Sequence, residues 1–329
     1  PRVREVRSLS KATLSQVIVV FEDDVDIYFA RQLVFERLST VRDSLPEGAE
    51  SELGPVSTGL GEIYQYTLSS DKHGPMELRT IQDWLVAPQL KTIPGVNEVN
   101  SFGGFVKQYH VLVNPDALLK YGIRLHDVVR AVADNNANAG GSFIVKGWEQ
   151  SYVRSVGLIR TIQDIQEIVL RAEDGTPVLL RDVAAVKVGP MTRQGAVTRD
   201  GEGEAVAGMV IMLKGQNSKQ VVSRVKQRIP RIQETLPAGV RIDTFYDRTS
   251  LIQACVGTVS SALFQGGVLV ILVLFLFLWN LRAALTVALS LPLTALIAFI
   301  LMDAGDVTAN LMSLGGLAMA IGMVVDGAI

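Results

Sequence analysis

One acidic residue, Asp326, lies inside an otherwise apolar run near the end of the chain, Met323-Val324-Val325-Asp326-Gly327-Ala328-Ile329. A carboxylate at bilayer depth costs roughly 2.5 kcal/mol or more on insertion scales, so such groups usually face the interior of a helix bundle and serve ion or proton movement. The alternative is an acid at the interface where the span ends, which the apolar residues after it argue against. Residue type and setting therefore indicate a proton-driven transporter.

Three methionines share a helical stripe with this aspartate. At ~100° per residue, Met312, Met319, Met323 and Asp326 fall within about 60° of one another on an α-helix. Thioethers prefer soft monovalent cations such as Cu(I), so the stripe could pass copper or silver beside the proton site. Methionine is also an ordinary filler of apolar gaps. Both interpretations stay open.

Motifs for other chemistries are missing from the sequence. The single cysteine, Cys255, excludes an internal disulfide framework and CxxC metal or redox motifs. There is no Gly-x4-Gly-Lys-Ser/Thr loop and no nucleophile motif, so neither nucleotide-driven nor enzymatic function is expected, and no resident cofactor. The three histidines, His73, His110 and His126, have no paired metal spacing. The formal net charge is −2 and the Lys and Arg residues are scattered, so the sequence has no basic cluster of the kind that binds nucleic acid.

The elements that must hold Asp326 are three apolar segments, at Ala262–Trp279, at Ala283–Met302 and from about Val307 onward. The first two carry no charge and approach the ~20 residues that span hydrocarbon, which predicts transmembrane helices. On the third, small residues would let neighbouring helices approach closely; they are Gly315, Gly316, Ala318, Ala320 and Gly322.

The loops between these segments set the expected orientation. Arg282 is the cation of the region, while Asp303 and Asp306 lie in the next loop. The positive-inside rule then places Arg282 in the cytoplasm and the soluble region outside it. Because Pro1 begins no signal peptide and Ile329 falls inside an apolar run, we expect an internal piece of a longer protein.

The soluble region, residues 1 to about 248, repeats one pattern. A strand, a helix and a Leu-Pro-x-Gly turn occur at Gln16–Phe21 with Ile27–Ser44, and again at Val206–Leu213 with Asn217–Thr235, before a strand at Arg241–Tyr246. This repetition predicts two related α+β subdomains with sheet-on-helix cores.

The first copy continues with a strand at Ile63–Leu68, a helix at Leu78–Thr92 and a strand at Val96–Phe102. These three strands and two helices within residues 1–103 are interpreted as belonging to a ferredoxin-like fold, whose full order is βαββαβ.

After Gly103-Gly104 the pattern indicates a strand at Val106–Val113 and helices at Pro115–Tyr121 and Leu125–Asn135. From 140 to 190 short strands alternate with turns, and only Ile162–Ile168 has a helical pattern. We interpret this β-rich stretch as an insertion within the second subdomain.

Several sequence runs together are specific to one family, and the similarity covers essentially the whole chain. They are Asp26-Ile27-Tyr28-Phe29-Ala30-Arg31-Gln32-Leu33-Val34 with Glu36-Arg37-Leu38, Gly54-Pro55-Val56-Ser57-Thr58-Gly59-Leu60-Gly61-Glu62-Ile63-Tyr64-Gln65-Tyr66, Asp134-Asn135-Asn136-Ala137-Asn138-Ala139-Gly140-Gly141, and the terminal Val324-Val325-Asp326-Gly327-Ala328. With them the chain resembles the heavy-metal efflux branch of the resistance-nodulation-division (RND) superfamily.

The resemblance implies a multi-pass pump of the bacterial inner membrane with a large periplasmic part. Such a pump is a homotrimer that exchanges metal cations for protons and is joined through a periplasmic adaptor protein to an outer-membrane duct. Residues 1–103 would be the first porter subdomain. Residues 104–147 and 205–246 would form the second, interrupted by a docking subdomain at 148–204. After a connector at 247–261, residues 262–329 would hold transmembrane helices two, three and part of four.

The resemblance also implies that Asp326 is the proton-relay aspartate of the fourth helix, with cationic and hydroxyl partners on later helices. Some relatives carry a second Asp six residues earlier in an Asp-Phe-Gly run, where this chain has Ala320-Ile321-Gly322. That departure leaves the cargo open between monovalent copper or silver and divalent zinc, cobalt, cadmium or nickel. Two other functions remain as alternatives: efflux of drugs or other amphiphiles, and a membrane-anchored periplasmic assembly module without transport.

Overall fold

A computed structural model describes all residues except 1, 13, 47, 174, 194, 202, 279, 280, 306, 308–310 and 329. The chain divides into two compact units, Pro1–Ser57 and Thr58–Ile329.

The first unit combines a hairpin with one helix. Strands β1 (Val3–Lys11) and β2 (Leu14–Phe21) pair antiparallel. Helix α1 (Ile27–Val41) begins after Asp26, whose carboxylate accepts hydrogen bonds from the backbone N–H groups of Tyr28 and Phe29, both at 2.9 Å. A 3₁₀ turn, η1 (Arg42–Ser44), completes the predicted helix. Strand β1 was not predicted, because its charged and apolar residues give it no distinct buried face.

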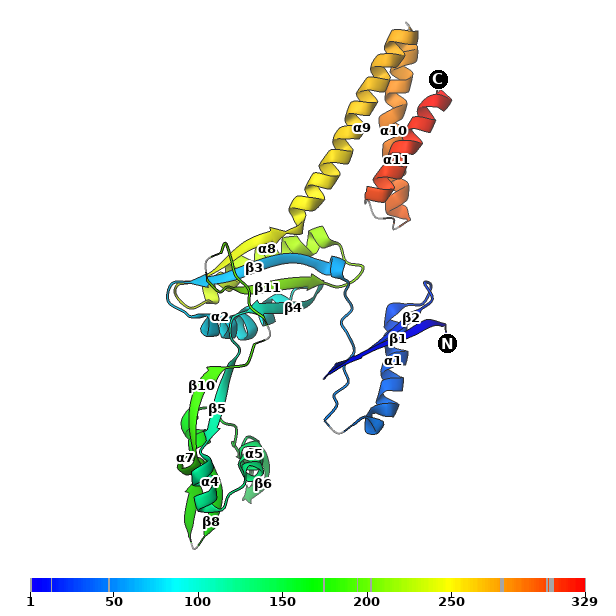
Figure 1. Ribbon diagram of the computed structural model, residues 1–329. Helices are drawn as coiled ribbons and strands as arrows, with labels where there is room; N and C mark the ends of the chain where they lie inside the picture. The colour runs from blue at the N-terminus through cyan, green and yellow to red at the C-terminus, as the bar shows by residue number, and fades with distance from the viewer. Residues whose placement is uncertain are drawn as a thin grey trace. The chain divides into compact units, whose positions relative to one another are not determined.

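The second unit is built on a four-stranded antiparallel sheet in the order β12-β3-β11-β4 (Figure 1). A short 3₁₀ turn, η2 (Gly59–Gly61), leads into the first of these strands. The strand bounds are β3 (Glu62–Ser70), β4 (Val96–Gly103), β11 (Val206–Met212) and β12 (Val240–Asp247). Strand β11 lies between β3 and β4 and pairs with both, which makes two βαβ halves interlock as in a ferredoxin-like sheet.

This sheet corrects the prediction that residues 1–103 form a ferredoxin-like unit by themselves. The ferredoxin-like order belongs to residues 62–103 together with 206–247. The physical reason is burial: β11, Val-Ala-Gly-Met-Val-Ile-Met, is apolar on both faces and takes a central place, whereas β1 is exposed along its whole length.

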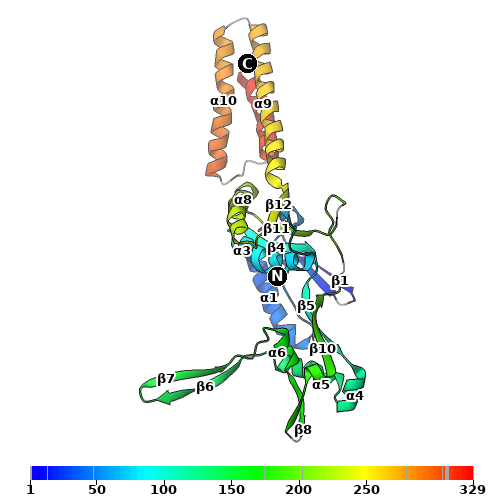
Figure 2. The same ribbon diagram turned by 90° about the vertical axis from the view of Figure 1, so that its left-hand side faces the viewer.

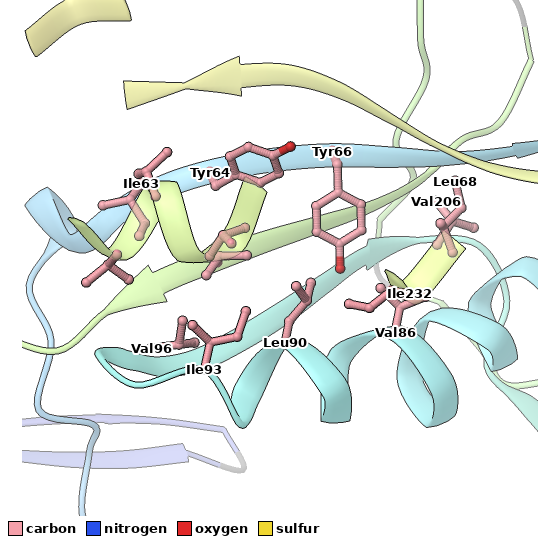
Figure 3. Packing of buried hydrophobic residues seen from close by; sticks show 14 of the residues in the cluster. Ile63, Tyr64, Tyr66, Leu68, Val86, Leu90, Ile93, Val96, Val206 and Ile232 are labelled. Atoms are coloured by element: carbon pink, nitrogen blue, oxygen red, sulfur yellow. The ribbon is translucent and has the colours of Figure 1, made fainter. Parts of the chain in front are cut away.

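Helices cover one face of the sheet and form its core. They are α2 (Pro75–Ile81), a π-helical turn η3 (Gln82–Val86), α3 (Ala87–Lys91) and α8 (Ser218–Thr235). Figure 3 shows the Tyr66 ring pointing from β3 towards the helix that carries Val86 and Leu90. The buried Tyr66 hydroxyl donates to Gln82 Oε1 at 3.0 Å, and Gln82 Nε2 donates to Ser101 Oγ at 3.3 Å. Desolvation raises the pKa of Tyr66, so this buried hydroxyl stays neutral.

A second core lies between residues 107 and 190. Strand β5 (Lys107–Val113) pairs with β10 (Ala184–Pro190) along its full length. The other elements are α4 (Pro115–Tyr121), α5 (Leu125–Asp134), α6 (Ile162–Gln166), β8 (Val169–Glu173), β9 (Thr176–Leu179) and α7 (Leu180–Val183). Buried side chains such as Leu180 and Val183 come from α7.

Strand β5 finds its partner in residues 184–190, because the apolar sides of β5 and β10 enclose the same small core. One prediction for this region is wrong. Ile162–Ile168 does not hold the only helix between 140 and 190, since the structure also has the four-residue α7, which is too short to show a period. The assignment of porter and docking subdomains at 1–103, 104–147, 148–204 and 205–246 stays a prediction.

A long hairpin leaves this second core. Strands β6 (Ala139–Lys146) and β7 (Glu149–Ser155) pair antiparallel and every residue in them is exposed. Figure 2 shows the hairpin extending away from the helices and strands around it.

Three helices end the chain, as the apolar segments predicted: α9 (Arg248–Leu278), α10 (Leu281–Ala304) and α11 (Leu311–Ala328). Helix α10 lies against α9 and α11 (Figures 1 and 2). In the described part of the chain, one helical segment is long and apolar enough to cross a membrane, Arg248–Val273, with 26 residues and a mean hydropathy of 1.9. Trp279 and Asp306, which end or flank the predicted spans, lie outside the described residues.

Candidate functional site

Asp326 lies in the last turn of α11, which runs from Leu311 to Ala328. The Asp326 side chain lies outside the described residues, and its role as proton relay stays a prediction.

The methionine stripe of α11 is exposed in this chain. Met312, Met319 and Met323 are 86%, 71% and 69% exposed, whereas Leu314 and Leu317 are each 8% exposed. At ~100° per residue, the two leucines lie roughly 140–200° around the helix from Met312. Leucines therefore form the packed side of α11, and the methionines are not gap fillers among α9, α10 and α11. A metal path, or packing against helices outside this chain, remains as the explanation of the stripe.

The small residues of α11 also leave room on its surface. An ideal Cβ on Gly315 or Gly316 would meet no heavy atom within 4 Å in the described structure. No described side chain of α9 or α10 occupies this space. The close approach of a neighbouring helix stays a prediction.

Strand β12 leads directly into α9, and the Asp247 side chain bonds to groups on both sides of this junction. Asp247 Oδ1 accepts a hydrogen bond from the Thr249 backbone N–H at 2.8 Å, which caps the start of α9. Asp247 Oδ2 pairs with Lys226 Nζ of α8 at 2.7 Å. Burial alone would raise the pKa of Asp247, but Lys226 and Thr249 outweigh it and hold the pKa below its usual range. Sequence reasoning missed this group, although an Asp directly before a long apolar helix is a recognisable N-cap signal.

The histidines do not assemble a metal site. His73 Nδ1 lies 2.9 Å from Glu77 Oε2, and His126 Nε2 lies 3.2 Å from Arg130 Nη2. Among the residues that the structure describes, no group of three or more His, Cys, Asp or Glu could hold a metal ion.

A family model described as the AcrB/AcrD/AcrF family matches residues 1–329, the whole chain. The chain belongs to the AcrB/AcrD/AcrF family. Within the family it is 47% identical to "Protein HelA" of Legionella pneumophila, and 45% identical both to "Cobalt-zinc-cadmium resistance protein CzcA" of Cupriavidus metallidurans and to "Cation efflux system protein CusA" of Escherichia coli. Each of these similarities covers 100% of this chain and 32% of the relative.

A solved structure has the same fold as this chain. The X-ray crystal structure of a heavy metal efflux pump matches with a TM-score of 0.89 and 39% identity, over 99% of this chain and 32% of that one. The resemblance to heavy-metal efflux pumps drawn from the sequence motifs is confirmed. The chain spans about a third of the length of the curated relatives it matches.

Proposed function

We propose that this chain is part of an inner-membrane pump that exports heavy-metal cations in exchange for protons. One observation carries the proposal: the whole chain is 45% identical to two proteins named for cation efflux and for cobalt, zinc and cadmium resistance. Metal cations are therefore preferred to drugs or other amphiphiles as cargo. No resident cofactor takes part.

In this pump α9, α10 and α11 cross the inner membrane, and residues 1–247 lie on the periplasmic side. The polar soluble region and the apolar helices support this arrangement. The working unit is a homotrimer connected through a periplasmic adaptor to an outer-membrane duct.

Protonation of Asp326 drives the cycle in this proposal. Adding or removing a proton changes which helix arrangement is stable, and α9 passes that change to β12 because no linker separates them. Such coupling links two sites through one conformational equilibrium. Each proton that crosses a 100 mV potential supplies about 2.3 kcal/mol, which can drive cations uphill.

The choice of metal rests on ligand chemistry. CzcA and CusA are equally similar to this chain, and only the name of CzcA specifies metals. If Met312, Met319 and Met323 lie on the path, their thioethers favour monovalent copper or silver; oxygen or imidazole ligands elsewhere would favour divalent zinc, cobalt, cadmium or nickel.

Transport by the full-length protein in proteoliposomes tests the proposal. Vesicles receive an imposed pH gradient and either Cu(I), Zn²⁺ or an amphiphilic dye, and an ionophore then removes the gradient. We expect flux of one class of metal cation that stops with the gradient. Flux of the dye without metal flux would favour amphiphile efflux, and no flux of any cargo would favour an assembly module.

A further inference from the structure

A pocket opens where the turn after β11 meets the first residue of α9. Its volume is about 210 Å³, and its wall includes Thr58, Leu60, Lys214, Ser218 and Arg248. Since one water needs only about 10–15 Å³ of such space, the pocket has room for a much larger group.

The charges of this pocket are all of one sign. Lys214 and Arg248 line it, and no acidic residue does. Within the described residues, neither cation forms an ion pair, although the nearby Lys226 is paired with Asp247 at 2.7 Å. The side chains that line the pocket therefore carry two positive charges and no negative one.

One of the two cations is held in place. Arg248 donates from Nη1 to the backbone carbonyl oxygen of Leu60, which fixes the guanidinium at the wall. A guanidinium has five N–H donors, so further donors remain for a ligand with several acceptor oxygens. The hydroxyls of Thr58 and Ser218 add donors at the same wall.

The helix that starts at this pocket is rich in basic residues. Helix α8, which starts at this pocket, carries five basic residues and one acidic residue, and it packs beside α9. Figure 1 shows α9 leaving the sheet next to α8. Arg248 is both a wall of the pocket and the first residue of the candidate span. A ligand here would thus lie close to the point where the chain enters its apolar segment.

We propose that this pocket binds a phosphate-bearing anion, either the headgroup of an anionic phospholipid or a free phosphate. Phosphate oxygens suit Arg and Lys donors because charge-assisted hydrogen bonds are short and strong. Basic residues next to a membrane helix attract anionic lipids by about 1 kcal/mol each, or roughly fivefold in affinity. The lipid source requires α9 to cross the membrane, but the pocket does not depend on which cargo is transported.

The test uses the full-length protein in nanodiscs of phosphatidylcholine with increasing phosphatidylglycerol, and native mass spectrometry counts the retained lipids. A parallel arm titrates inorganic phosphate in phosphatidylcholine alone. In Lys214→Gln/Arg248→Gln we expect phosphatidylglycerol retention to weaken about 25-fold. The matched control is Lys91→Gln/Lys187→Gln, which removes two exposed cations outside the pocket and should retain the lipid as wild type does.

The two arms distinguish the sources. Loss of phosphatidylglycerol retention without any effect of phosphate identifies a lipid headgroup, whereas phosphate binding that the same substitutions remove identifies a free anion. Equal retention in the pocket variant and the control, with no phosphate binding, overturns the proposal. Should the double variant fail to fold, the single variant Lys214→Gln, at an exposed position, tests the same proposal. We expect it to weaken phosphatidylglycerol retention about fivefold.

Discussion

At the scale of single residues, the contact between Gly208 and Tyr66 decides how β11 and β3 fit together. A Cβ at Gly208 would lie 2.3 Å from Cζ of the fully buried Tyr66 ring. We therefore expect Gly208→Ala to overpack the core and to destabilise it by roughly 1–3 kcal/mol. Hydrogen exchange of the β3 and β11 amides in the full-length protein measures this change. Gly54→Ala is the control, since an ideal Cβ there meets nothing within 4 Å, and equal exchange in the two variants would contradict the packing.

The protonation state of Asp243 makes the stability of the sheet depend on pH. Its carboxylate accepts a hydrogen bond from Ser69 at 2.7 Å and pairs with Arg199 at 3.1 Å, and these partners hold its pKa below the usual range. A lowered folded-state pKa gives stability that is present above the unfolded pKa of about 3.9 and is lost as pH falls through the folded value. Protection of β12 amides should thus fall below about pH 4 in wild type, and Asp243→Asn should remove part of that dependence. An identical pH profile in both proteins would contradict the assignment.

The methionine stripe makes a separate prediction about cargo. Replacing Met312, Met319 and Met323 by leucine keeps their approximate size and removes the thioethers. If the stripe is a metal path, Cu(I) flux through the full-length pump falls while folding is kept, because soft cations lose their ligands. Isotope flux in proteoliposomes measures Cu(I) transport, and size-exclusion elution shows whether the variant is folded. Unchanged Cu(I) flux would leave packing against further helices as the role of the stripe.

At the scale of elements, the junction between β12 and α9 is where movement of a helix could be transmitted to the sheet. The strand ends at Asp247 and the helix begins at Arg248. Because no linker separates them, we expect movement of α9 to displace the sheet. Two glycines inserted between these residues should lower metal flux in the full-length pump and leave the sheet folded. The control places the same insertion after Gly147, in the exposed turn of the β6–β7 hairpin. Equal flux in both insertion variants would show that the junction transmits nothing.

Most elements could be predicted from the sequence because their local signals are strong. Helix α4 has the predicted bounds, where Asn114 caps its start, Pro115 is its first residue and Gly122 ends it with a φ of 62°. Strand β1 and helix α7 were missed because neither has a periodic apolar face of useful length. The buried Gln82 also gave no sequence signal of its partner, since Tyr66 meets it only through the packing of α2 and η3 on the sheet.

At the scale of the whole molecule, the grouping of strands was beyond sequence reasoning. Strands β4 and β11 are neighbours although about a hundred residues lie between them, and local patterns contain nothing about such pairing. The family and the acidic residue on α11 could be predicted from the sequence, because short specific runs and a carboxylate in an apolar helix are local features. The partners of Asp326 could not be predicted, because a local pattern does not reveal which side chains from other helices lie beside it.

The measurement that tests the central claim most directly is proton and metal flux in the same vesicles for wild type, Asp326→Asn and Asp303→Asn of the full-length pump. Asparagine keeps the shape of the side chain but cannot exchange a proton. Coupled proton and metal flux should disappear in Asp326→Asn and persist in Asp303→Asn, which alters an exposed carboxylate near the end of α10. Wild-type proton-driven metal flux in Asp326→Asn would contradict the account.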